Sequence, residues 1–263
     1  LYATWIEWNS PNELQVRVSK WNGDTDSPVW TLVDGGADDG INVSPPKDAG
    51  SPKLIAFNNT LYAVWDEYQY GTEDVIRIKE WDGATTWTSI DGSSDFGLNR
   101  NKTTRQNAQK PAPVIYNGTL CVVWHEINES SSISQIRIAQ WNGDSDTPVW
   151  SFIDGNDINF GINYITGINA ENAHALVFNN NLYVTWNEAT SSYGTQIRVK
   201  KWNGSTWSFV DGNGANGINF SAGNNAYEPK LIEFNGRLFA GWHEQVNAGS
   251  IQNIRVKQSN SGF

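Results

Sequence analysis

Short runs of alternating apolar and polar residues, separated by Asn, Asp and Gly, recur along the whole chain. The segment 61–67 is one such run, and Asn58-Asn59 precede it. Period-two alternation between turn residues is typical of a β-strand and not of a helix. Asn and Gly also tolerate the positive φ that tight hairpin turns require. The pattern therefore predicts antiparallel hairpins and no helices.

The same run occurs five times, and each copy ends in Trp, one variable residue and Glu. The copies follow one another at intervals of about 60 residues, and a fixed interval is the signature of one structural unit repeated in tandem. In the copy that begins at Pro52, the pattern predicts four strands, at 53–57, 61–67, 75–81 and 87–90. A Trp-Asn/Asp-Gly turn follows the third strand, and Gly-Ile/Leu-Asn lies in the connection to the next copy. The five units span about 1–51, 52–110, 111–172, 173–228 and 229–263.

Units of four short antiparallel strands that repeat around an axis are the blades of a β-propeller. We therefore expect an all-β single domain over residues 1–263, most simply a five-bladed propeller. The first unit begins at its second strand and the last lacks a fourth, so both terminal blades should be incomplete. Residues 258–263 are a candidate for a substitute outer strand. The alternative is a piece of a larger array that another chain completes.

Composition and charge limit the classes of molecule that the protein is expected to bind. The chain of 263 residues has 14 Trp, 9 Tyr and 10 Phe but only 17% charged residues, which fits a turn-rich β protein. Its net charge of −10 argues against binding to nucleic acid or to an anionic membrane. No segment reaches the roughly 18 apolar residues of a membrane span, so we expect no membrane insertion. The only cysteine, Cys121, replaces a Tyr or Phe of other copies and should be buried.

Three polar residue types recur near the loops that vary most between copies: the Glu of Trp-x-Glu, an Arg in the third strand, and the Asn of the connection. Glu and Arg lie on neighbouring strands, so one interpretation is a structural ion pair. The other is that carboxylate, guanidinium and amide border a Trp-walled cleft between blades. The candidate ligand-binding residues are Trp5, Glu7, Trp65, Glu67, Trp124, Glu126, Trp186, Glu188, Trp242, Glu244, Arg17, Arg77, Arg137, Arg198, Arg255, Asn42, Asn99, Asn163 and Asn219.

The tryptophans also allow two interpretations. Large aromatic residues in alternating strands are expected to pack blade against blade. A Trp face bordered by carboxylate and amide groups is, however, also a surface that suits a sugar ring, which presents both C–H patches and hydroxyl groups. His125 and His243 occupy the variable position of Trp-x-Glu, where other copies have Ile6, Asp66 and Asn187. A repeated metal site is therefore not expected, and no motif indicates a cofactor.

A resemblance to known repeats supports the sugar interpretation. The pattern Pro-x-Leu-Ile-x-Phe-Asn-x-x-Leu-Tyr-x-x-Trp, which begins at Pro52, resembles the blade repeats of secreted bacterial propellers. It is also broadly similar to lectin propellers of the tachylectin-2 type, although the repeats here are longer. This resemblance implies a carbohydrate-binding protein with glycans or glycoconjugates as partners and an extracellular or cell-surface location.

Repetition of one potential site favours multivalent binding, so we expect a non-catalytic, lectin-like propeller. A glycosidase needs two carboxyl groups in unlike environments at a single place, which should interrupt the repeat. The Glu of Trp-x-Glu is instead present in all five copies. Two alternatives stay open. One is a non-catalytic protein-binding or spacer domain of a bacterial surface protein or toxin, and the other is a glycoside hydrolase.

Overall fold

A computed structural model describes residues 1–9, 13–36, 40–43, 47–69, 73–92, 95–100, 107–128, 131–155, 161–190, 194–212, 214, 216–246 and 251–259. These residues form β-strands joined by turns, and no helix among them could cross a membrane. The strands are β1 (Tyr2–Trp8), β2 (Leu14–Trp21), β3 (Trp30–Leu32), β4 (Ala49–Phe57), β5 (Thr60–Gln69), β6 (Glu73–Trp81), β7 (Trp87–Ser89), β8 (Ala108–Tyr116), β9 (Thr119–Asn128), β10 (Ile133–Trp141), β11 (Trp150–Phe152), β12 (Ala170–Phe178), β13 (Asn181–Ala189), β14 (Thr195–Trp202), β15 (Trp207–Phe209), β16 (Ala226–Phe234), β17 (Arg237–Gln245) and β18 (Gln252–Gln258).

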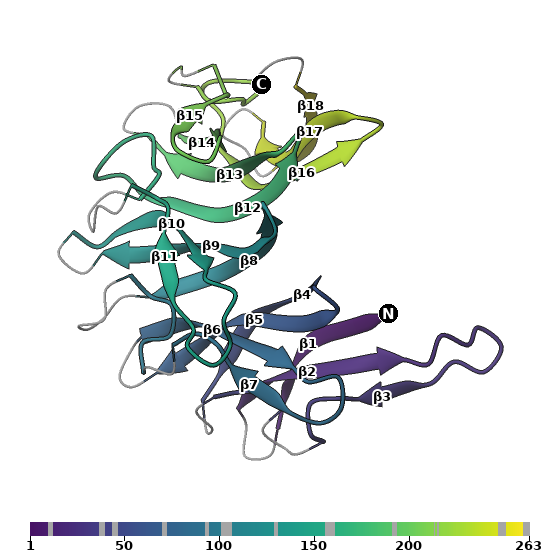
Figure 1. Ribbon diagram of the computed structural model, residues 1–263. Coiled ribbons are helices and arrows are strands. Elements are labelled where there is room, and N and C mark those ends of the chain that lie inside the picture. The colour runs from purple at the N-terminus through teal and green to yellow at the C-terminus, as the bar shows by residue number, and fades with distance from the viewer. Residues whose placement is uncertain are drawn as a thin grey trace.

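The strands form five antiparallel sheets that follow one another in chain order (Figure 1). Sheets β4–β7, β8–β11 and β12–β15 have four strands each, whereas β1–β3 and β16–β18 have three. The first strands of the last four sheets, β4, β8, β12 and β16, lie beside one another in this order, and β1 lies beside β4. The predicted propeller of five blades with incomplete first and last blades is confirmed.

The core lies between the blades. Four clusters of buried apolar residues each join two consecutive sheets. In all blades but the first, the Trp of the Trp-x-Glu motif belongs to these clusters, and Trp65, Trp124 and Trp186 are completely buried. Cys121 is also buried. This agrees with the expectation from the Tyr or Phe that other copies of the repeat have at this position. A blade therefore hides its apolar face only by packing against the next blade.

The two terminal blades expose residues that are buried in the other blades. Trp5 in β1 is 36% exposed, although its counterpart Trp65 is 0% exposed. In β18, Ile254 is 79% exposed, whereas its counterpart Ile76 in β6 is 0% exposed. Gln258 ends β18, and the rest of the candidate outer strand at 258–263 lies almost wholly outside the described residues.

The hairpin turns follow the predicted chemistry. The Asn residues of these turns all have positive φ, between 47° and 62°: Asn58, Asn59, Asn117, Asn179, Asn180 and Asn235. Asn accepts this conformation at lower cost than other residues with a Cβ atom. The Asn-Asn and Asn-Gly pairs therefore fix where the first strand of each blade turns into the second.

The innermost strands begin earlier than the sequence predicts, and a β-bulge is the reason. The expected first strand of the second blade begins at Lys53, because Pro52 cannot donate a hydrogen bond to a ladder. In the structure β4 begins at Ala49, and its pairing with β5 shifts between Gly50 and Lys53. Ser51 and Pro52 lie in the bulge, where the missing N–H of proline has no ladder bond to make. The same shift occurs in β8, β12 and β16.

The connection between blades is held by a glycine that contacts the third strand. In Gly161-Ile162-Asn163, the N–H of Ile162 donates to the carbonyl of Ile136 at 3.1 Å. A Cβ atom on Gly161 would lie 2.3 Å from that carbonyl oxygen. Gly161 also has a φ of 45°, so both the space and the backbone conformation require glycine.

We predict that Gly161→Ala lowers the free energy of unfolding by more than about 3 kcal/mol, because a left-handed backbone and a backbone clash act together. Gly143→Ala is the matched control, since Gly143 has a φ of 81° and nothing within 4 Å of an added Cβ. That change should cost only about 1 kcal/mol. Urea unfolding measures both, and equal losses would contradict the proposed contact.

Candidate functional site

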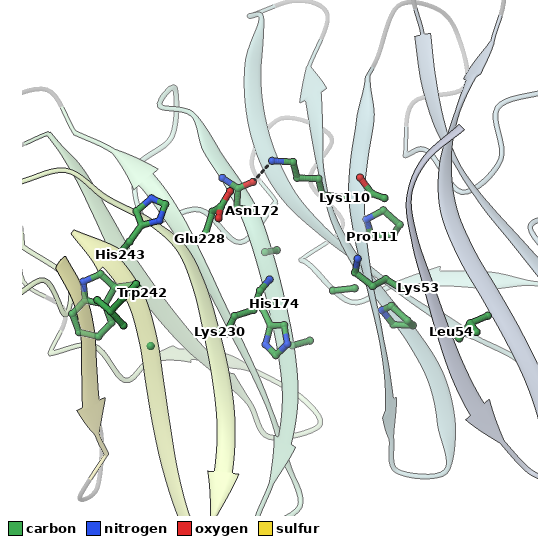
Figure 2. A pocket seen from close by; sticks show the side chains of 17 residues that line it. Lys53, Leu54, Lys110, Pro111, Asn172, His174, Glu228, Lys230, Trp242 and His243 are labelled. Carbon is green, nitrogen blue, oxygen red and sulfur yellow. Dashed lines mark hydrogen bonds between the residues drawn. The ribbon is translucent and has the colours of Figure 1, made fainter. Parts of the chain in front are cut away.

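The innermost strands surround a cavity of about 770 Å³ at the centre of the propeller (Figure 2). Its walls come from β4, β8, β12 and β16, with further residues from β17 and β18. A concave volume of several hundred cubic ångströms is the usual size of a small-molecule site. This cavity is therefore the candidate functional site.

Each of the four β-bulges places the side chain of its first residue at the cavity. The bulged residues are Ser51, Lys110, Asn172 and Glu228, and all four have positive φ, between 50° and 58°. They occupy the same position in the repeat but differ in chemistry: a hydroxyl, an ammonium, an amide and a carboxylate. Lys110 Nζ donates to Asn172 Oδ1 at 2.6 Å, so neighbouring blades are connected across this ring (Figure 2).

A second set of cavity residues lies two positions further along the strands. Lys53, His174 and Lys230 occupy this position in β4, β12 and β16. His174 Nδ1 accepts the backbone N–H of Leu231 at 3.2 Å. Burial lowers the pKa of His174 to about 4, and the positive charges of Lys230 and Lys53 act in the same direction. The imidazole is therefore neutral near pH 7.

Asp66 borders the cavity behind the bulges. Its Oδ1 accepts the backbone N–H of Lys110 at 2.9 Å, and Ser51 also hydrogen-bonds to the carboxyl group. Burial raises the pKa of Asp66 above its ordinary value, and these hydrogen bonds only partly oppose the shift. Asp66 is 9% exposed. A carboxyl group that holds its proton more strongly than usual thus lies next to residues that line the cavity.

The residues equivalent to Asp66 in other blades also lie against their own bulges. Asn187 Oδ1 accepts Asn172 Nδ2 at 2.8 Å, and the His243 ring lies 5.6 Å from the Tyr227 ring, centroid to centroid. Burial lowers the pKa of His125 to about 4, with a smaller contribution from a nearby lysine charge. The variable residue of Trp-x-Glu therefore supports the cavity wall.

The Trp and Glu residues predicted as binding residues lie at the junctions between blades. In the fourth blade, Glu188 accepts the indole N–H of Trp186 at 2.7 Å. It also accepts the backbone N–H groups of Tyr164 and Ile165, in the connection from the preceding blade, at 2.8 and 2.6 Å. Each of the other Trp–Glu pairs makes the same indole bond: Trp5–Glu7, Trp65–Glu67, Trp124–Glu126 and Trp242–Glu244.

Connection amides of the preceding blade also bind Glu67, Glu126 and Glu244. These three carboxylates are at most 2% exposed, as is Glu188. We call this arrangement, an indole and the connection amides on one buried Glu, the junction clamp. The junction clamp occupies the space between blades in which the sequence suggested a Trp-walled cleft.

The predicted arginines pair with aspartates of their own blade. The bonds join Arg17 to Asp34, Arg77 to Asp91, Arg137 to Asp154 and Arg198 to Asp211, at 3.0 to 3.5 Å. The aspartate belongs to the Ile/Val-Asp-Gly sequence after the fourth strand, whereas the sequence suggested the rim Glu as the partner. Arg255, in the last blade, lies over the Phe220 ring at 4.2 Å.

The predicted asparagines hold the connections to the third strands. Asn163 Oδ1 accepts the N–H of Ile136 at 2.9 Å, and its amide nitrogen donates to the carbonyls of Ser134 and Ile168. Asn42, Asn99 and Asn219 accept the N–H of the equivalent third-strand residues. That any of the nineteen candidate residues also contacts a ligand stays a prediction. Of them, only Trp242 lines the cavity.

Sequence reasoning missed the bulge residues, although the sequence carries a signal for them. Three innermost strands begin with Ala-x-x-Pro, at Ala49, Ala108 and Ala226, and β12 has Ala170-Glu171-Asn172-Ala173. The two middle positions differ in every copy. When residues differ between copies at one position of an otherwise similar repeat, that position is expected to have a different role in each blade.

Known proteins share this fold at low sequence identity. No protein-family model and no curated protein sequence matches the chain. An endo-arabinase from Bacteroides thetaiotaomicron VPI-5482 is 11% identical with a TM-score of 0.56, and the match covers 100% of this chain and 91% of that one. An exo-1,5-alpha-L-arabinanase from a bovine ruminal metagenomic library is 13% identical, with a TM-score of 0.51 and coverage of 100% and 91%. A protein described as a glycoside hydrolase is 12% identical, with a TM-score of 0.51 and coverage of 94% and 79%.

These neighbours contradict two expectations from the sequence. The chain was expected to be a non-catalytic, lectin-like propeller and not an enzyme, but these three solved structures that share its fold are named as glycoside-cleaving enzymes. At this level of identity the likeness establishes the fold. The physical reason for the error is that the sequence argument sought an interruption of the repeat among the Trp-x-Glu residues, whereas the repeat is interrupted at the bulges.

We predict that Glu188→Ala destabilises the protein by about 3 kcal/mol, because it leaves an indole and two connection amides buried without an acceptor. Glu7→Ala is the matched control. Glu7 accepts the same indole bond from Trp5, at 3.0 Å, but its side chain is exposed. Its removal should leave the midpoint of urea unfolding nearly unchanged. Similar losses in the two variants would show that the junction clamp adds nothing.

We predict that stability falls as the pH drops from about 6.5 towards 4. The pKa of His125 is about 4 in the folded protein and ordinarily 6.5, so in this window the unfolded chain binds the extra proton. His125→Asn, which installs the residue found at Asn187, should reduce the difference in unfolding free energy between pH 7 and pH 4 by about 2 to 3 kcal/mol. An unchanged pH dependence in urea unfolding would contradict the buried, neutral state of His125.

Proposed function

We propose that the protein hydrolyses a glycosidic bond in the central cavity, with Asp66 and Glu228 as the two reacting carboxyl groups. The observation that carries this proposal is the pair of unlike carboxyl environments at one cavity. Asp66 is buried at the wall with a raised pKa, and Glu228 is exposed and lines the cavity. The fold shared with glycoside-cleaving enzymes supports it.

Glycoside hydrolysis commonly needs one carboxylic acid to protonate the leaving oxygen and one carboxylate to activate water or to attack the sugar. Residues whose environments push their pKa values apart suit these two roles. Because burial raises the pKa of Asp66, its carboxyl group keeps a proton to higher pH and is the general acid. Glu228 is the carboxylate on the open side of the cavity.

The rest of the cavity suits a sugar. Leu54, Pro111 and Trp242 supply apolar surface, and Ser51 and Asn172 supply polar groups. Pyranose and furanose rings present both C–H faces and hydroxyl groups, so a site of mixed chemistry fits them. The site is single and axial, in contrast to the repeated sites expected of a multivalent binder.

The test is a reducing-sugar assay on a panel of polysaccharides, together with a panel of nitrophenyl glycosides. Asp66→Asn and Glu228→Gln should each lower kcat by about 100-fold or more, the usual effect of removing a general acid or base. Glu233→Gln is the control, because Glu233 lies on β16 with Glu228, is exposed, accepts the N–H of Gly236 at 2.8 Å and does not line the cavity. Turnover that survives both substitutions, or no turnover on any substrate, would refute the assignment.

A further inference from the structure

The central cavity carries an excess of positive charge, although the whole chain has a net charge of −10. Lys53, Lys110 and Lys230 line it, from three different blades. Glu228 is the single carboxylate among the described lining residues. A cluster of ammonium groups inside an acidic protein is a local feature that the overall charge does not explain.

The ammonium groups influence one another. Burial lowers the pKa of Lys230, and the positive charges of Lys53 and Lys110 lower it further, while Glu228 raises it. Lys53 and Lys230 also lower the pKa of His174. Positive charges this close repel one another, and an anion placed among them would relieve the repulsion. The geometry of three lysines around one volume therefore favours an anionic occupant.

Lys110 is held in place by neighbouring amides. Asn172 Nδ2 donates to Asn187 Oδ1 at 2.8 Å, which fixes the orientation of the Asn172 amide. Asn172 Oδ1 then accepts from Lys110 Nζ at 2.6 Å. An ammonium group has three donors, so others are left for a ligand. Both Asn172 and Lys110 lie at bulges, where the side chain is directed into the cavity (Figure 2).

His174 adds a neutral donor and no charge. Its Nδ1 accepts the N–H of Leu231, so the proton of the neutral ring is on Nε2. The groups of the cavity that carry charge or a fixed proton are thus mostly donors: three ammonium groups and an imidazole N–H, against one carboxylate. A ligand rich in acceptors and carrying negative charge is the best match.

We propose that the central cavity binds a sugar unit bearing an anionic group, either the carboxylate of a uronic acid or a sulfate ester, through the ammonium groups of Lys53, Lys110 and Lys230. The inference rests on the proposed glycoside hydrolysis for the sugar itself and names the class of substrate. The anionic group lies among the lysines, and the apolar wall that includes Trp242 faces the ring.

Calorimetric titration of the full chain tests this with matched probes: tetragalacturonate, its neutral methyl ester, a sulfated galactan tetrasaccharide and neutral galactotetraose. An anionic probe should bind at least about tenfold more tightly than its neutral partner, because the neutral partner lacks at least one charge-assisted hydrogen bond. Its affinity should also fall when NaCl rises from low to high concentration. The carboxylated and sulfated arms distinguish the two sources of the charge.

Lysine variants locate the binding. Lys53→Gln and Lys230→Gln should each weaken binding of the preferred anionic probe at least about fivefold, because each removes one ionic partner. Lys257→Gln is the control, since Lys257 is an exposed lysine on β18 outside the cavity. Equal affinity for charged and neutral probes, equal loss in the control variant, or no binding of any anionic probe would overturn the proposal.

The two proposals can fail separately. Binding of an anionic tetrasaccharide that depends on Lys53 and Lys230, with no turnover of any glycoside, would support the anion site and refute the hydrolase. Turnover of neutral glycosides that depends on Asp66 and Glu228, with no preference for charged substrates, would support the hydrolase and refute the anion site. An NMR titration of His174 adds a local signal, because an anion bound beside it should raise the pKa of its imidazole.

Discussion

The junction clamp is the interaction on which the rest of the structure depends. A carboxylate that is almost completely buried must have partners, because removing an ion from water is costly. Glu188 obtains these partners from two blades: the indole of Trp186 and the amides of Tyr164 and Ile165. Neither blade can satisfy the group alone. Blade order and spacing are therefore enforced by a polar contact as well as by apolar packing.

The outer strands add a second polar contact at the same junctions. Trp87 donates its indole N–H to the carbonyl of Val33 in the preceding blade at 2.8 Å, and Trp150 donates to Ile90 at 2.7 Å. Trp207 makes the same bond to the carbonyl of Ile153. The first three junctions are thus joined near the inner edge by a carboxylate and near the outer edge by an indole, and the junction with the last blade has the carboxylate alone among the described residues. These contacts position the innermost strands that line the cavity.

The sequence predicts the framework well because the framework repeats. Hairpin turns at Asn-Asn and Asn-Gly and the alternating strands are local features with strong signals. The bulges were missed, because Pro52 looks like a strand boundary unless the recurring Ala-x-x-Pro is interpreted as a bulge within the strand. The partner of Arg77 was also missed: Glu67 and Asp91 are both acidic and both near in the repeat, and only the three-dimensional structure distinguishes them. The cavity residues were missed because they do not recur.

The bulge also explains how a symmetric molecule can have an asymmetric centre. Its side chain lies at the cavity and takes no part in the strand ladder, so a substitution there leaves the strand pairing intact. The left-handed backbone excludes mainly β-branched side chains and leaves a wide choice of chemistry, as Ser51, Lys110, Asn172 and Glu228 illustrate. After duplication of an ancestral blade, each copy could diverge at this one position by single mutations. The chemistry of the cavity could thus change independently of folding.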